Sequence, residues 1–138
     1  MNRKSRKGFS LIELVIVVLI LGIIAAVAAP RMFDTASTAE ENTTRQQLAV
    51  MRNAIEMYRA RNAAYPTDLT VAMSEMLNGS FPVPMVGTAR NKPGVHYDAT
   101  TTDVDAAVDV GVDAGWAYKA HNGSLRLNVA DATLGSDW

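Results

Sequence analysis

Oxygen-bearing side chains gather in one segment late in the chain. Residues 98–115 include no basic residue and five aspartates: Asp98, Asp103, Asp105, Asp109 and Asp113. Carboxylate oxygens are ligands that Ca²⁺ prefers, although the spacing is not that of an EF-hand loop. Two interpretations stay open: a calcium site with Asp103 and Asp105 among its ligands, or a solvated acidic loop.

The other chemistry-bearing residues do not form a catalytic pattern. His96 and His121 stand alone, with no nucleophile at a matching spacing and no second histidine four residues away. The sequence has no cysteine, which excludes disulfides and thiol catalysis, and it has no glycine-rich phosphate-binding motif. We therefore expect a protein that is not an enzyme and that requires no cofactor.

One further acidic residue lies in an apolar segment, where a charge is energetically costly. Glu13 is the only charged residue in the apolar run 9–29, which follows a leader, residues 1–8, with four basic residues and no acid. As a helix, the run reaches roughly 30 Å, the hydrocarbon thickness of a bilayer, and the basic flank predicts a cytoplasmic N-terminus. An acid inside a membrane is by default a functional residue that needs a partner.

Three simpler interpretations compete for this run. A secretory signal peptide fits the A-x-A-like site Ala26-Val27-Ala28, but the run is longer than the usual apolar region of about 7–15 residues. A plain membrane anchor leaves Glu13 without a reason, because a charged side chain is costly in a membrane. A buried core helix leaves the basic leader unexplained.

The residues around Glu13 resemble the processing motif of type IV pilins and type II secretion pseudopilins. The stretch reads Lys7-Gly8-Phe9-Ser10-Leu11-Ile12-Glu13-Leu14. It has the obligatory glycine of that family, an apolar aromatic residue next to it, and a glutamate in the family's register after the cut. The resemblance continues through Gly22 and Pro30 and covers the first third of the chain.

This resemblance implies how the chain matures and what it contacts. A prepilin peptidase would cut between Gly8 and Phe9 and methylate the new Phe9 amine, and Glu13 would pair with that amine on a neighbouring subunit. The implied partners are further copies of this chain, other pilins or pseudopilins, and an inner-membrane assembly platform with a separate ATPase. The family also implies calcium in the C-terminal loop, here at Asp103 and Asp105. The head would be periplasmic, with the helix in the bacterial inner membrane.

After the apolar run, the pattern becomes that of a helix packed on one side. Apolar residues recur at helical spacing at Leu48, Met51, Ala54, Ile55 and Tyr58. No strong stop precedes Asn62, so we expect one helix over residues 9–62. Gly22 and Pro30 are the candidate bends, because proline removes a helical hydrogen bond. An arginine stripe, Arg45, Arg52 and Arg59, lies on another face; it is interpreted as solvated, with a binding surface as the alternative.

Residues 63–138 are expected to form a head that uses this helix as one wall of its core. Thr67 is expected to cap a short helix over residues 68–77. Period-two alternation over 116–121 and 124–129 around Asn122-Gly123 predicts a hairpin with a two-residue turn, and residues 95–97 a third strand. The predicted fold class is α+β, with a long N-terminal helix on a small antiparallel sheet.

Removal of the leader changes the charge of the chain. The full sequence has 13 basic and 14 acidic residues, a formal charge of −1. Without the four basic residues of the leader, the charge becomes −5. Nucleic-acid binders are normally basic, so no nucleic acid is expected as a partner.

Together these observations predict a pilin-like structural subunit of a filament. A type II secretion pseudopilin is preferred over a type IV pilus subunit, which would serve adhesion, motility or DNA uptake. The preference rests on Tyr65-Pro66-Thr67, which is similar to the point where pseudopilins leave their helix. It also rests on the missing cysteines, since many adhesive pilins close their C-terminal loop with a disulfide. A membrane-anchored periplasmic binding module that never polymerises is the alternative from another class.

Overall fold

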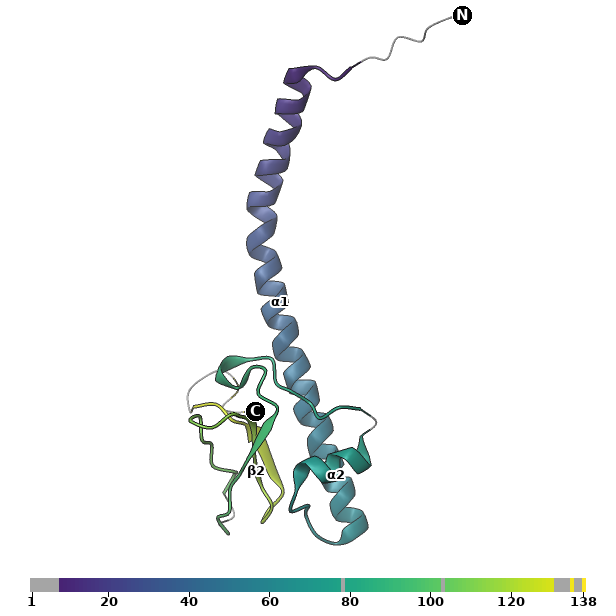
Figure 1. The fold of residues 1–138 in the computed structure, drawn as a ribbon, viewed down its shortest axis with the longest axis vertical. Helices are drawn as coiled ribbons and strands as arrows, with labels where there is room; N and C mark the ends of the chain where they lie inside the picture. Colours follow the sequence, from purple (N-terminus) through teal and green to yellow (C-terminus); the bar gives the residue numbers. More distant parts are fainter. Residues whose placement is uncertain (1–7, 78, 103, 131–134, 136–137) are drawn as a thin grey trace, which may run out of the picture. The chain divides into compact units, whose positions relative to one another are not determined.

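A computed structural model describes residues 8–77, 79–102, 104–130, 135 and 138. Its helices are α1 (Leu11–Asn62), α2 (Leu69–Met76) and a short 3-10 helix η1 (Gly87–Ala89). Its strands are β1 (Gly94–Tyr97), β2 (Ala114–Lys119) and β3 (Ser124–Leu127) (Figure 1). The chain forms two compact units, and the boundary between them divides α1 after Thr38.

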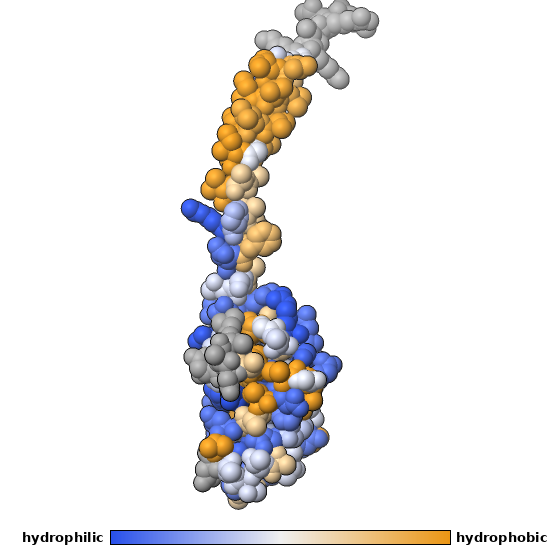
Figure 2. Space-filling view, turned by 90° about the vertical axis from the view of Figure 1, so that its left-hand side faces the viewer, coloured by the Kyte–Doolittle hydropathy of each residue, from blue (hydrophilic) through white to orange (hydrophobic). Residues whose placement is uncertain are grey.

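The first unit is an α-helical segment with an apolar surface. Helix α1 begins at Leu11, two residues later than predicted, and stays α-helical through Gly22 and Pro30. Its large apolar side chains, from Phe9 to Phe33, are 48–84% exposed. In Figure 2 the described side chains of this segment are mostly orange, the colour of hydrophobic residues. Bends at Gly22 and Pro30 stay a prediction.

The second unit, residues 39–138, is the head, and its core lies between the last part of α1 and the sheet. Leu48, Met51, Ala54 and Ile55 are at most 2% exposed. They pack with the inward side chains of the sheet: Trp116, Tyr118, Leu125 and Leu127, with Val129 after β3. The predicted helical stripe is therefore confirmed, and alternate residues of the predicted hairpin complete the core. The head thus buries its apolar side chains against α1, which forms one wall of its core as expected.

The sheet is mixed, not antiparallel throughout. β2 is the central strand, fully buried along its length, with β1 on one side and β3 on the other. β2 and β3 pair antiparallel, as predicted, whereas β1 runs parallel to β2 with Tyr97 opposite Tyr118. A parallel pair needs a crossover, which is usually helical. Here residues 98–113 make it without regular structure at the described positions.

The hairpin turn is longer than the sequence predicts. Lys119 pairs with Ser124, so four residues, 120–123, form the turn in place of Asn122-Gly123 alone. The Gly123 amide donates to the Lys119 carbonyl at 2.9 Å, and Gly123 has a φ of 74°. A two-residue type I′ turn needs positive φ at both central residues. Gly123 meets that requirement but Asn122 does not.

Helix α2 is capped by Asp68 and not by the predicted Thr67. The Asp68 carboxylate accepts the amides of Thr70 at 2.9 Å and Val71 at 3.3 Å. The carboxylate thereby satisfies two amides that would otherwise have no partner at the helix start. A hydrogen bond from the Thr70 hydroxyl, together with those from the two amides, holds the pKa of Asp68 below its usual value. Leu69, Ala72 and Met73 are buried on the inner face, so the predicted short helix is confirmed.

Replacing Gly123 with alanine is expected to destabilise the head. A Cβ there would collide with the Tyr65 ring, and the left-handed φ is unfavourable for alanine. We expect a loss of about 1–3 kcal/mol, read from thermal unfolding followed by circular dichroism. Gly22→Ala is the control, because a Cβ at Gly22 meets no atom within 4 Å. Equal melting temperatures for the two variants would contradict the prediction.

Candidate functional site

The predicted cleavage point lies in a short segment before α1. Gly8 and Phe9 precede the helix, and Phe9 is 84% exposed. Apart from its chain neighbours, no described residue has an atom within 4 Å of where a Cβ of Gly8 would be. The peptide bond between them is thus open to an enzyme, and glycine adds no side chain that could obstruct it. The rest of the leader, residues 1–7, lies outside the described residues.

Glu13 has a local partner that the sequence analysis missed. The Ser10 amide donates to the Glu13 carboxylate, with 2.8 Å between Ser10 N and Glu13 Oε2. Ser10 precedes the first helical residue and Glu13 is the third, so the pair has the S-x-x-E spacing of a capping box. That spacing is visible in the sequence and could have revealed the contact. The helix N-terminus also favours a negative charge by its dipole.

The apolar segment behind Glu13 is long enough to cross a bilayer. One helix of the described residues passes a test of length and composition for a membrane span, near the N-terminus of the chain. Its apolar window is not buried by any described residue. An exposed apolar surface of this extent marks a site for lipid or protein contact. The segment therefore fits the predicted membrane anchor, while its use as a polymerisation surface stays a prediction.

The arginine stripe is exposed, and each of its three members also contacts a residue of the head. Arg52 donates to the Leu125 carbonyl from Nε at 3.0 Å and from Nη2 at 2.8 Å. Its burial lowers the pKa of its guanidinium, an effect opposed by the charge of Asp105. Two further arginines stack on aromatic rings, Arg45 on Trp138 at 4.2 Å and Arg59 on Tyr65 at 4.6 Å from the ring centroids. All three arginines are exposed, as the preferred interpretation of a solvated face predicts, and each also connects α1 to a residue of the head.

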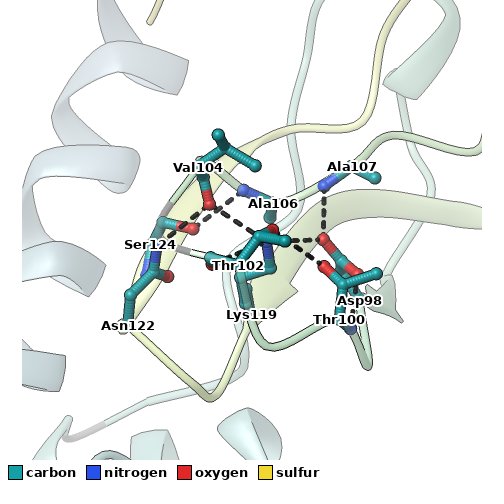
Figure 3. A network of polar contacts seen from close by, with 9 residues as sticks. All are labelled: Asp98, Thr100, Thr102, Val104, Ala106, Ala107, Lys119, Asn122 and Ser124. Carbon is teal, nitrogen blue, oxygen red and sulfur yellow. Dashed lines mark hydrogen bonds and ion pairs between the residues drawn. The ribbon is translucent and has the colours of Figure 1, made fainter.

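The acidic crossover is organised around a buried ion pair. The Lys119 ammonium lies 3.2 Å from Asp98 Oδ2, and both side chains are almost completely buried, at 0% and 5% exposure. Asp98 also accepts the amides of Thr100 and Ala107, each at 2.9 Å. These amide hydrogen bonds, chiefly that of Ala107, and the Lys119 contact hold the pKa of Asp98 far below its usual range. Figure 3 shows the network.

The calcium prediction is not tested by this arrangement. Asp103 lies outside the described residues, while Asp105 is exposed. Within the described part of the chain, no three or more histidine or acidic side chains are grouped so that they could hold a metal ion. His96 lies in β1 and His121 in the turn after β2. Calcium at Asp103 and Asp105 stays a prediction at this point.

Comparisons with known proteins agree with the N-terminal geometry. Residues 3–29 match the family described as a prokaryotic N-terminal methylation motif. The chain is 31% identical over 67 residues to the type II secretion system core protein G of Klebsiella michiganensis. It is 36% identical over 67 residues to that of Pseudomonas aeruginosa. Each match covers 49% of this chain and 47% of the relative, so the chain spans about half the length of these relatives.

A third relative is aligned over more of the chain. Fimbrial protein EcpC of Eikenella corrodens is 30% identical over 96 residues, 69% of this chain and 63% of the relative. No solved structure matches the chain significantly. The processing motif, the apolar helix and the α+β head agree with these sequence matches. These matches support the family of type IV pilins and type II secretion pseudopilins for this chain, and residues 3–29 carry its N-terminal methylation motif.

We expect the stability of the head to depend on pH through the buried carboxylate of Asp98. The pKa of Asp98 is lowered in the fold from an unfolded value of about 3.9, so its ionised form stabilises the head above roughly pH 4. That contribution is lost as the pH falls toward the folded pKa. We expect Asp98→Asn to lower the melting temperature at neutral pH, with a difference from the wild type that narrows below about pH 4.

The matched control is Asp113→Asn, which removes the same charge from an exposed position of the same crossover. Thermal unfolding of the two variants and the wild type is measured over a series of acidic to neutral buffers. A constant deficit for Asp98→Asn at every pH would show that its ionisation does not stabilise the fold. Equal losses of melting temperature in Asp98→Asn and Asp113→Asn would also show that the ionisation of Asp98 does not stabilise the fold.

Proposed function

We propose that this chain is a structural subunit of a pilus-like filament and, within that class, a type II secretion pseudopilin. The observation that carries the proposal is the coincidence of three features in one register: the open Gly8-Phe9 bond, Glu13 in the first helical turn, and the uncovered apolar helix. Apolar surface of this extent is favourable only when lipid or other apolar helices cover it. The likeness to proteins named type II secretion system core protein G supports the secretion assignment.

The proposed maturation uses the residues before α1. A prepilin peptidase cuts between Gly8 and Phe9 and methylates the Phe9 amine, which removes the basic leader and leaves a charge of −5. The helix then keeps its apolar run, and its first charged side chain is Glu13. Cleavage thus converts a helix with a cytoplasmic cationic tag into one whose new terminal amine lies near the membrane boundary.

Glu13 can serve both the single subunit and the filament. In the subunit, Oε2 accepts the Ser10 amide. A carboxylate has two oxygens and about four acceptor positions, so Oε1 is available to the Phe9 amine of a neighbouring subunit. An α-amino group with a pKa near 7.7–8.0 is largely cationic at neutral pH and can offset the buried carboxylate. Such a pair would fix the axial register between subunits.

The proposed location and partners follow from this assembly. The subunit crosses the bacterial inner membrane once, with a cytoplasmic N-terminus and a periplasmic head, before it enters a filament. The basic residues of the leader support that orientation. Its partners are copies of itself, other pilins or pseudopilins, the prepilin peptidase, and an assembly platform driven by a separate ATPase. The role is structural, and nucleic acid is not among the proposed partners.

A type IV pilus subunit is the second candidate. The likeness to fimbrial protein EcpC favours it, since that match extends beyond the N-terminal helix and covers 69% of this chain. The two functions share processing and assembly, and they differ in the machine that builds the filament. Loss of protein secretion on deletion of the gene would favour the pseudopilin, and loss of surface pili would favour the pilus subunit.

Processing tests the filament class directly. We expect co-expression with a prepilin peptidase to shorten the chain by eight residues and leave an N-terminal methylated Phe9, as measured by intact mass and N-terminal sequencing. Gly8→Val places a side chain at the open cleavage position and should block the cut. Cleavage after Ala28 by a signal peptidase, or no cleavage at all, would overturn the proposal in favour of an exported protein or a plain anchor.

Glu13 tests assembly separately from processing. We expect Glu13→Ala to be cleaved and inserted into the membrane but to form few or no filaments, because the neighbouring amine loses its partner. Asp34→Ala is the matched control, since Asp34 is an exposed acid on the same helical segment. Filaments are counted by electron microscopy after shearing. A normal yield from Glu13→Ala would remove the carboxylate from the assembly mechanism.

A further inference from the structure

The structure assigns a built-in cation to the crossover between β1 and β2: we propose that the ammonium of Lys119 takes the place of a calcium ion, so that the head needs no metal. The proposal concerns residues 98–107 and the hairpin β2–β3. It stands whether or not the chain forms filaments, because it depends only on contacts within the head.

Lys119 is the last residue of β2, and its side chain is 0% exposed. A lysine is almost never fully buried unless its charge is paired. The Nζ has four oxygens within hydrogen-bond distance: Asp98 Oδ2 at 3.2 Å, Thr102 O at 3.2 Å, Thr102 Oγ1 at 3.0 Å and Val104 O at 3.0 Å. Figure 3 shows these residues converging on the end of the lysine side chain. The ammonium therefore lies in a closed set of oxygen acceptors.

The oxygens come from a segment that has no regular structure of its own. Asp98 directly follows β1, and Thr102 and Val104 lie in the crossover. Their carbonyl oxygens would cost free energy if buried without a donor. Because one ammonium has three donor hydrogens, Lys119 can satisfy several of them at once. Lys119 thus organises the crossover by binding several of its oxygens, as a bound metal ion organises the loop that ligates it.

The hairpin holds the same segment through two further hydrogen bonds. Asn122 Nδ2 also donates to the Val104 carbonyl at 3.0 Å, and Ser124 Oγ accepts the Ala106 amide at 2.8 Å. Asp98 Oδ2, which contacts Lys119, also accepts the Ala107 amide. The Asp98 carboxylate therefore binds both Lys119 and the Ala107 amide, and Thr102 and Val104, which lie between residues 98 and 107, also contact Lys119.

The described donor set does not fit calcium. Calcium takes six to eight oxygens at about 2.3–2.6 Å and usually several carboxylates. Here the described set has one carboxylate and three neutral oxygens, which balances the single charge of an ammonium. A calcium ion among these oxygens would also lie next to the Lys119 charge. The family's implied metal is thus replaced, in this head, by a cation attached to the chain.

Wild-type protein gives the first test. We expect the full chain in detergent to have the same melting temperature in millimolar calcium and in excess EGTA. We also expect the Lys119 ammonium to give a slowly exchanging signal in NMR spectra of ¹⁵N-lysine protein at neutral pH. Four lysines occur in the sequence, and two of them, Lys92 and Lys119, lie in the head, so assignment needs one variant.

Variants give the second test. Lys119→Met keeps the length and apolar stem but removes the ammonium, and we expect it to lower the melting temperature by about 5 °C or more. Lys92→Met is the matched control, because Lys92 is part-exposed and makes one long contact, at 3.3 Å, with the Val112 carbonyl. Adding Asp98→Asn to Lys119→Met should recover part of the lost melting temperature, because the double variant no longer has a buried carboxylate without a cation.

Two outcomes would overturn the proposal. One is a wild-type melting temperature that rises with calcium and falls with EGTA, above all if changing Asp103 and Asp105 abolishes the effect. The other is a Lys119→Met variant as stable as Lys92→Met. If Lys119→Met does not fold, the wild type decides: calcium independence together with a protected ammonium supports the proposal, and an ammonium that exchanges as fast as that of Lys92 refutes it.

Discussion

The fold depends on a change of surface within a single helix. Up to Phe33 the apolar side chains of α1 lie on all sides and are exposed, whereas from Leu48 to Ile55 they form one buried stripe. A helix that is apolar all round needs apolar surroundings, and a helix with one apolar face needs a single packing partner. The sequence of α1 therefore requires two environments, one supplied from outside the chain and the other by residues 63–138.

The head supplies the second of these environments, and it does so with little regular structure. Its sheet has three short strands, and the parallel pair β1–β2 needs a crossover that forms no helix at its described positions. Polar side chains from the hairpin hold this crossover instead. Lys119 binds its first half, and Asn128 binds its second half through the Asp109 amide at 2.8 Å and the Asp109 carbonyl at 2.7 Å. Buried polar groups of this kind are favourable only when their hydrogen bonds are satisfied.

The features predicted from sequence were those set by periodicity or by a local motif. The stripe from Leu48 to Ile55 repeats at helical spacing, and the hairpin strands alternate, so both could be read without a structure. The parallel direction of β1 could not, because alternation does not reveal which way a strand runs. The sequence predicts too short a turn. Asn122-Gly123 is a strong signal for a two-residue turn, but β2 ends at Lys119 and the turn has four residues.

The polar contacts of the site were the least predictable from sequence. The acidic segment suggested a metal because its carboxylates could be counted, whereas the partner of Asp98 is a lysine 21 residues away on another strand. Likewise, the arginine stripe on α1 gave no sign that Arg52 would donate to the Leu125 carbonyl, 73 residues away. Such pairs depend on register between elements, which a single sequence does not specify. The Ser10–Glu13 contact is local, and its spacing was available to be read.

The capping contact also bears on how an acid can enter an apolar helix. A buried, unpaired carboxylate is costly, and an amine from another subunit arrives only when that subunit docks. Before docking, the Ser10 amide and the positive end of the helix dipole already stabilise the Glu13 charge. For the proposed filament, this means that the amine of Phe9 meets a carboxylate that a hydrogen bond within its own subunit already orients. In the proposed filament, the contact that would set register between subunits is thus prepared within each one before assembly.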